Sequence, residues 1–101
     1  MNSEELKKVI VEKLDYVTLE QLEDTGESYK LGIEEITDDE NIIKSLEEKS
    51  IEELDTSSFY YKDGSDDEKL FMISYTESLD VILIHLVNMN NGEVKLSSIN
   101  I

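Results

Sequence analysis

The chain has 101 residues and a formal net charge of −16, from 25 acidic and 9 basic residues. This length predicts one domain, and 39% hydrophobic residues suffice for one modest core. The absence of cysteine excludes disulfides and thiolate chemistry. The negative charge repels phosphate, which argues against direct binding to nucleic acid or to an anionic membrane.

The first residues, Met1–Glu5, lack the basic and apolar regions of a signal peptide, and no run of 18 apolar residues suggests a membrane span. We therefore expect a cytoplasmic protein, in the host cell cytoplasm if it is phage-encoded. The acidic charge predicts a basic partner protein, since it would attract and steer a basic surface. A surface that only increases solubility is the alternative.

A first helical region is predicted from Ser3 onward. Ser3 is placed to cap the helix, and acidic residues fill its first turn. Apolar residues then recur at three- and four-residue spacing and form one stripe: Leu6, Val9, Ile10, Leu14 and Val17. Thr18 and Gln21 make a possible capping box, which predicts a short helical turn that Gly26 ends.

A strand and a second helical region follow. Tyr29–Glu34 alternates between apolar and polar or small residues, which is the period of a strand. Thr37–Glu40 has the pattern of a capping box, and Ile42, Ile43 and Leu46 give the next helix a buried stripe. Ser50–Leu54 either continues that helix or restarts it.

The last forty residues predict a β-meander. Four segments have strand-like patterns: Ser58–Lys62, Leu70–Tyr75, Val81–Val87 and Val94–Ser98. The third is apolar except for His85, which suggests a central strand covered on both faces. Asp63–Asp67 and Asn90–Gly92 are predicted turns. The sequence therefore predicts a single α+β domain over residues 1–101, with two helical regions packed on a roughly five-stranded antiparallel sheet.

No group of residues is typical of an enzyme. His85 is the only histidine, and its apolar neighbours favour a core or sheet-face role. With no cysteine, a single histidine argues against a zinc site. Asp63, Ser65, Asp67 and Glu68 share part of the spacing of a calcium loop, but the glycine and the distal glutamate are misplaced, which favours a solvated turn. We predict no catalytic residue, no cofactor and no metal.

Five carboxylates gather where the predicted strand meets the second helix: Glu34, Glu35, Asp38, Asp39 and Glu40. One or two acids suffice to complement the exposed N–H groups of a helix start. The others are candidates to present charges to a partner in the way that a row of backbone phosphates does. The alternative is a solvated face with no partner.

Several strings resemble the bacteriophage-type uracil-DNA glycosylase inhibitors. Ile33–Asp39 looks like the acidic strand-to-helix junction of one branch of that family, and Asp63–Met72 looks like the acidic hairpin and apolar strand of another. The turn Asn90–Glu93 also falls where a family turn falls, and the likeness covers about Tyr29 to Ile99.

The resemblance implies a small acidic protein that imitates DNA and occupies the DNA-binding groove of the glycosylase, one-to-one. It also implies a short strand before the second helix, followed by an antiparallel meander. The family's Glu-Ser-Ile string falls on Leu31–Ile33 by direct alignment, or on Glu34–Ile36 after a three-residue shift. The main phosphate-mimicking carboxylate is therefore Glu34, Glu35 or an acid of the helix.

The family also has an apolar pocket between the second helix and the sheet. It receives the side chain that the enzyme uses to fill the space of a flipped base. The candidates for this pocket here are Ile42, Ile43, Leu46, Phe71 and Ile73, and ordinary core packing is the alternative for each. Two other functions share the same physics: an immunity protein or antitoxin for a basic nuclease, and an anti-CRISPR or anti-restriction DNA mimic.

Overall fold

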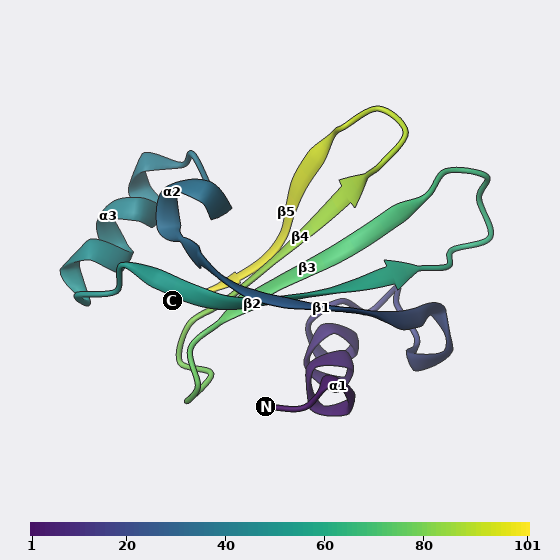
Figure 1. Cartoon of the computed structure of the whole chain (residues 1–101), viewed down its shortest axis with the longest axis horizontal. Coiled ribbons are helices and arrows are strands. Elements are labelled where there is room, and N and C mark those ends of the chain that lie inside the picture. The colour runs from purple at the N-terminus through teal and green to yellow at the C-terminus, as the bar shows by residue number, and fades with distance from the viewer.

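The computed structural model describes residues 1–101 as three α-helices packed on one five-stranded antiparallel sheet (Figure 1). The helical elements are α1 (Ser3–Lys13), the 3-10 helix η1 (Leu19–Gln21), α2 (Ile33–Ile36) and α3 (Glu40–Glu48). The strands are β1 (Leu22–Gly32), β2 (Glu53–Tyr61), β3 (Lys69–Tyr75), β4 (Ile82–Asn88) and β5 (Val94–Asn100). They lie in the sheet in chain order. The predicted α+β fold is confirmed.

Helix α1 is capped one residue earlier than predicted. The side chain of Asn2, and not that of Ser3, accepts a hydrogen bond from the backbone N–H of Glu5, at 2.9 Å. The helix ends at Lys13, so Leu14 and Val17 lie beyond it, although both are buried. The apolar stripe therefore predicts which side chains are buried better than it predicts where the helix ends.

The strand β1 is longer than predicted because Gly26 does not end a helical turn. The predicted turn does form, as η1, and the Thr18 N–H donates to the Gln21 side chain at 3.0 Å. Gly26 lies inside β1 with a φ of +82°, where the register with β2 shifts between Asp24 and Ser28. A positive φ at an irregularity in a strand is a position that favours glycine.

Two further boundaries differ from the prediction. Ile33–Ile36 forms the helical turn α2, so the predicted strand stops at Gly32 and does not reach Glu34. Helix α3 ends at Glu48, and Ser50 has a φ of +61°, which stops the helix instead of continuing it. Leu54 consequently belongs to β2. None of the helices has the length and apolar character that crossing a membrane requires.

Two separate apolar clusters cover opposite faces of the sheet. The larger cluster has 12 buried residues and joins α1 to the face that carries Phe59, Phe71 and Ile84. The smaller has six, and joins α2 and α3 to the face that carries Leu83. Leu83 and Ile84 are neighbours along β4, so their side chains point to opposite faces. Figure 1 shows α1 on one side of the sheet and α2 and α3 on the other, at one end.

Much of the face that carries α2 and α3 is left open by these helices. Residues of this face that are exposed or half-buried include Tyr29, Tyr60, Leu70, Met72, Val87, Val94 and Leu96. Strand β4 is correspondingly buried from Ile82 to His85 and only half-buried from Leu86 to Asn88. The predicted covering of this strand on both faces therefore holds for its first half only.

Candidate protein-binding surface

The five predicted acids lie together on one connection between β1 and α3. Glu34 and Glu35 belong to α2, Asp38 and Asp39 to the following link, and Glu40 begins α3. All five are exposed. The structure therefore brings together the whole acidic group that the sequence singled out, and we call it the acidic junction.

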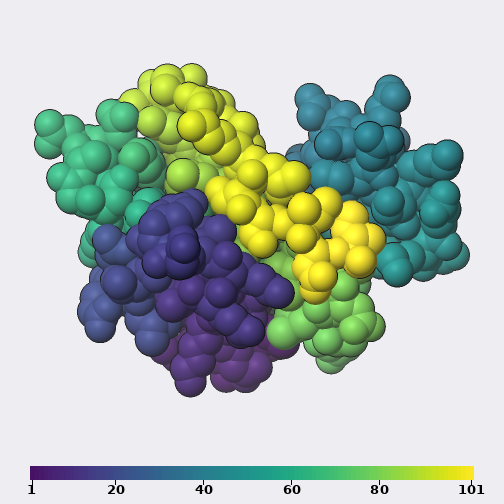
Figure 2. Space-filling model, turned by 180° about the vertical axis from the view of Figure 1, so that it is seen from behind, coloured from purple at the N-terminus to yellow at the C-terminus, as the bar shows by residue number.

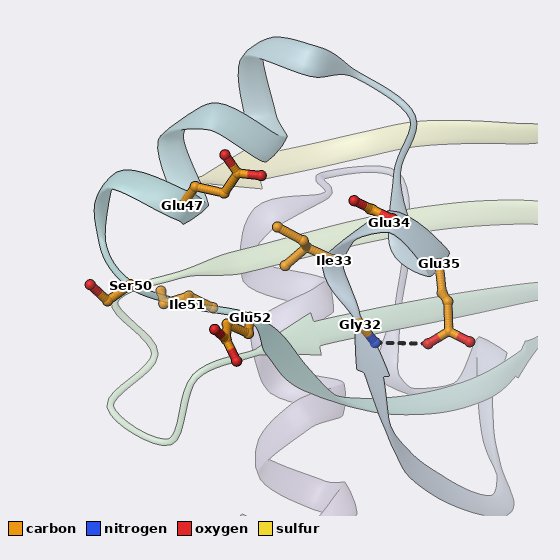
Figure 3. Close-up of a pocket in the computed structure, with 8 residues that line it drawn as sticks. All are labelled: Gly32, Ile33, Glu34, Glu35, Glu47, Ser50, Ile51 and Glu52. Atoms are coloured by element: carbon orange, nitrogen blue, oxygen red, sulfur yellow. Dashed lines mark hydrogen bonds between the residues drawn. The ribbon is translucent and has the colours of Figure 1, made fainter.

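Two members of the acidic junction have local structural roles. Glu35 turns back and accepts a hydrogen bond from the backbone N–H of Gly32 at 2.8 Å (Figure 3). Asp39 caps α3 by accepting from the N–H groups of Asn41 at 2.9 Å and Ile42 at 3.4 Å. An Asp at this position stabilises a helix start by about 1 kcal/mol. These two carboxylates hold the connection in shape.

The carboxylates of Glu34, Asp38 and Glu40 have no hydrogen bond or ion pair within the chain, whose four ion pairs all lie elsewhere. Three negative charges thus remain available on an ordered segment. The sequence alone could not distinguish these three carboxylates from those of Glu35 and Asp39. The distinction depends on which acidic side chain accepts the backbone hydrogen bonds at each helix start.

The predicted apolar pocket does not form from its five candidate residues. Ile42 and Leu46 are buried in the smaller cluster, with Ile43 packed against it. Phe71 and Ile73 are buried in the larger cluster, beneath α1. Alternate residues of a strand share a face, and these two odd-numbered positions of β3 face away from α3. The prediction was wrong because one sequence shows the period of a strand but not which face each helix covers.

A different hollow borders the acidic junction. It has a volume of about 460 Å³ and lies between the junction and β5, over one residue of β4. Its lining consists of Glu34, Glu35, Ile36, Thr37, Asp38, Asp39, His85, Val94 and Leu96. Figure 2 shows it as a deep gap between the teal α2–α3 segment and yellow β5. We call it the junction groove.

His85 lies in the junction groove, on the sheet face opposite α1. Its side chain points to the same face as that of Leu83, two residues earlier. It is only 7% exposed, and burial lowers the pKa of its ring. The predicted sheet-face position is confirmed. The sequence did not identify Val94 and Leu96 as its neighbours, because their strand reads as an ordinary amphipathic edge.

A second, larger hollow lies at the other side of α2 (Figure 3). Its volume is about 730 Å³, and its lining includes four glutamates: Glu34, Glu35, Glu47 and Glu52. Figure 3 shows their carboxylates spread around the rim rather than converging on one point. Consistent with this, no three His, Cys, Asp or Glu side chains of the chain come together in a way that could hold a metal ion.

The acidic hairpin between β2 and β3 is fixed by its own contacts. Asp63 pairs with Lys69 at 2.6 Å, and Asp67 accepts hydrogen bonds from the side chains of Asn88 at 3.0 Å and Asn90 at 2.8 Å. The hairpin is therefore tied to the turn between β4 and β5. Asp66, in contrast, is exposed and takes part in none of these contacts.

Replacing Asp63 with asparagine is expected to remove stability that depends on pH. The hydrogen bond from Lys69 holds the pKa of Asp63 well below its usual range, which is about 3.9 in an unfolded chain. A group whose pKa is lower in the folded state stabilises the fold fully at pH values above its unfolded-state pKa. This stabilisation is lost as the pH falls through the folded-state pKa. The difference in urea midpoint between wild type and Asp63→Asn should be constant above about pH 5 and shrink below about pH 4.

The matched control for this measurement is Asp66→Asn, which changes the same charge on the same hairpin without breaking a contact. Its urea midpoint should follow that of the wild type at every pH. If Asp63→Asn also follows the wild type throughout, the ion pair with Lys69 contributes nothing to stability.

No protein-family model matches the chain, and neither a curated protein nor a solved structure matches it.

Proposed function

We propose that this protein is a DNA-mimic inhibitor of uracil-DNA glycosylase that acts in the cytoplasm by binding, without catalysis, cofactor or metal. One observation carries the proposal. Three free carboxylates, those of Glu34, Asp38 and Glu40, stand on an ordered connection beside the part of a sheet face that α2 and α3 leave open. Charge and uncovered apolar surface lie side by side, which is typical of a protein-binding surface.

The charges suit the DNA-binding groove of a glycosylase. Such a groove is positive because it binds the phosphates of DNA. Carboxylates held in place by the caps of Glu35 and Asp39 can meet its cations without first being ordered. The charge of −16 would accelerate the encounter, while contacts on the open sheet face would slow dissociation.

The choice of glycosylase as the target is supported by the family resemblance. The strings that carry it fall on the acidic junction, on the β2–β3 hairpin and on the turn after β4. The order of elements is also the one that the resemblance implies: a strand, a helical region, and an antiparallel meander. The apolar pocket of the family has no counterpart built from the five residues first considered, so the proposal relies on the acidic junction and the open face.

The test is uracil excision from a labelled oligonucleotide, titrated with this protein. We expect wild type to inhibit stoichiometrically, in competition with DNA. The double variant Glu34→Gln, Asp38→Asn keeps the shape of both side chains and removes two free charges. Each charge-assisted hydrogen bond contributes about 1.5–3 kcal/mol, so with two of them lost half-inhibition should need at least about a hundredfold more of this variant at low salt. The difference should shrink as salt is added.

The matched control is Glu12→Gln, Asp15→Asn. Both residues are exposed, and they lie in or just after α1, on the other side of the sheet. This variant has the same net charge as the junction variant and should inhibit almost as well as wild type. Excision that continues unchanged with wild type in excess would contradict the proposed function. If the two double variants inhibit equally well, the binding surface does not include the acidic junction.

A further inference from the structure

The junction groove has two chemically different sides. One side is acidic and carries the free carboxylates of Glu34 and Asp38. The other is apolar and consists of Val94 and Leu96 on β5, which are 57% and 41% exposed. An apolar side next to a negative side does not suit a purely hydrophobic side chain, because that side chain would be buried beside uncompensated charges.

His85 gives independent support for a ligand at this position. The residue is only 7% exposed, it lines the groove, and it makes no side-chain hydrogen bond within the protein. Since no fully buried side-chain nitrogen of the chain lacks a partner, the ring nitrogens of His85 are open to the groove, where a bound ligand can meet them. Its lowered pKa also leaves the imidazole uncharged at neutral pH, so it does not repel a cation.

We propose that the junction groove binds an arginine side chain of the partner protein. The aliphatic stem would lie on Val94 and Leu96, and the guanidinium would meet Glu34 and Asp38. The proposal rests on the proposed function for the identity of the partner only. The family resemblance implied that an apolar side chain of the partner enters an apolar pocket. Here we expect a cationic side chain in a groove that is acidic on one side and apolar on the other.

Arginine fits better than the other long side chains. Leucine would leave the carboxylates without a partner. Lysine has a suitable stem, but its ammonium is a strongly hydrated point charge, whereas the planar guanidinium binds carboxylates in pairs of hydrogen bonds and stacks on aromatic rings. The imidazole of His85 offers such a ring.

The experiment uses NMR on the full chain, in which His85 is the only histidine and its ring protons give isolated signals. The probe is acetyl-Gly-Arg-Gly-amide, and the comparison peptides carry lysine or the uncharged norleucine in place of arginine. We expect saturable shifts of the His85 ring protons and of the Val94 and Leu96 methyl groups with arginine. The lysine peptide should bind less tightly, and the norleucine peptide should give no saturable shift.

Comparing the two double variants shows whether the arginine peptide binds at the junction groove or is only attracted by the overall negative charge of the protein. Each exposed ion pair strengthens binding about 1.4- to 5-fold, so Glu34→Gln, Asp38→Asn should weaken arginine-peptide binding about 2- to 30-fold. Glu12→Gln, Asp15→Asn should leave it within about twofold. Equal weakening by both variants, no shift with arginine, or equal binding of the norleucine peptide would each overturn the proposal. The NMR experiment contains no glycosylase, so it tests the groove independently of the proposed function. If the chain binds the arginine peptide but does not inhibit uracil excision, the proposed function is contradicted and the arginine site is not.

Discussion

Replacing Phe71 with alanine is expected to lower the free energy of unfolding by about 3–5 kcal/mol. Phe71 is fully buried in the middle of β3, in the cluster of 12 residues beneath α1. Its ring lies 4.7 Å from the ring of Tyr61, in a tilted arrangement. Removing it leaves a cavity between the sheet and α1 that neighbours on a paired strand cannot fill. Urea unfolding followed by circular dichroism measures the change.

The control for this substitution is Val94→Ala, on the exposed edge strand. Val94 is 57% exposed, and a substitution at such a position usually changes stability by less than about 0.5 kcal/mol. If Phe71→Ala is as stable as Val94→Ala, the larger cluster is not the main source of stability. A glycosylase-inhibition assay of Phe71→Ala below its unfolding midpoint should remain normal, because Phe71 lies on the face away from the acidic junction.

The substitution Leu46→Asp is expected to abolish both the packing of α3 and inhibition. Leu46 is fully buried, and the smaller cluster contains no cation that could pair with a new carboxylate. An unpaired buried charge costs several kcal/mol, which is a large part of the stability of a domain of this size. Amide NMR spectra should lose the native signals of Ile33, Ile42 and Leu54, which share the cluster with Leu46.

Leu46→Ala provides a milder variant for the same position. It removes apolar contacts without introducing charge, and it should cost about 2–5 kcal/mol while leaving some folded protein to assay. A Leu46→Asp protein that keeps the native spectrum and inhibits normally would show that Leu46 belongs neither to the core nor to the binding surface.

The sequence predicted the sheet well where the pattern of side chains alone determines the structure. Leu70–Tyr75 was predicted as a strand, and β3 differs from it by one residue. Gly92 has the positive φ that its turn requires, at +73°. In contrast, β2 begins five residues before the predicted Ser58. The first part of β2 buries polar side chains that form hydrogen bonds with other side chains, such as Thr56 with Ser74 at 2.9 Å. Buried polar residues do not produce the alternation of apolar and polar residues from which a strand is predicted.

The candidate site was predicted only in part, for a different reason. The acidic junction is contiguous in sequence, so its members had to lie close together. The apolar residues near it come from distant strands, and their grouping depends on which of the two faces of the sheet α3 covers. Phe71 and Ile73 were assigned to the wrong face for that reason, and Val94, Leu96 and His85 were not grouped at all.

The order of the strands bears on how this chain folds during its synthesis. Each strand pairs only with its neighbours in the sequence, so no segment must wait for a distant one, and such local topologies fold comparatively fast. Neither apolar cluster contains a residue of β5. The buried residues of both cores thus come from the segments up to β4, and we expect both cores to be able to form before β5 adds to the sheet. Because β5 supplies Val94 and Leu96, the apolar side of the junction groove depends on a strand that neither core requires.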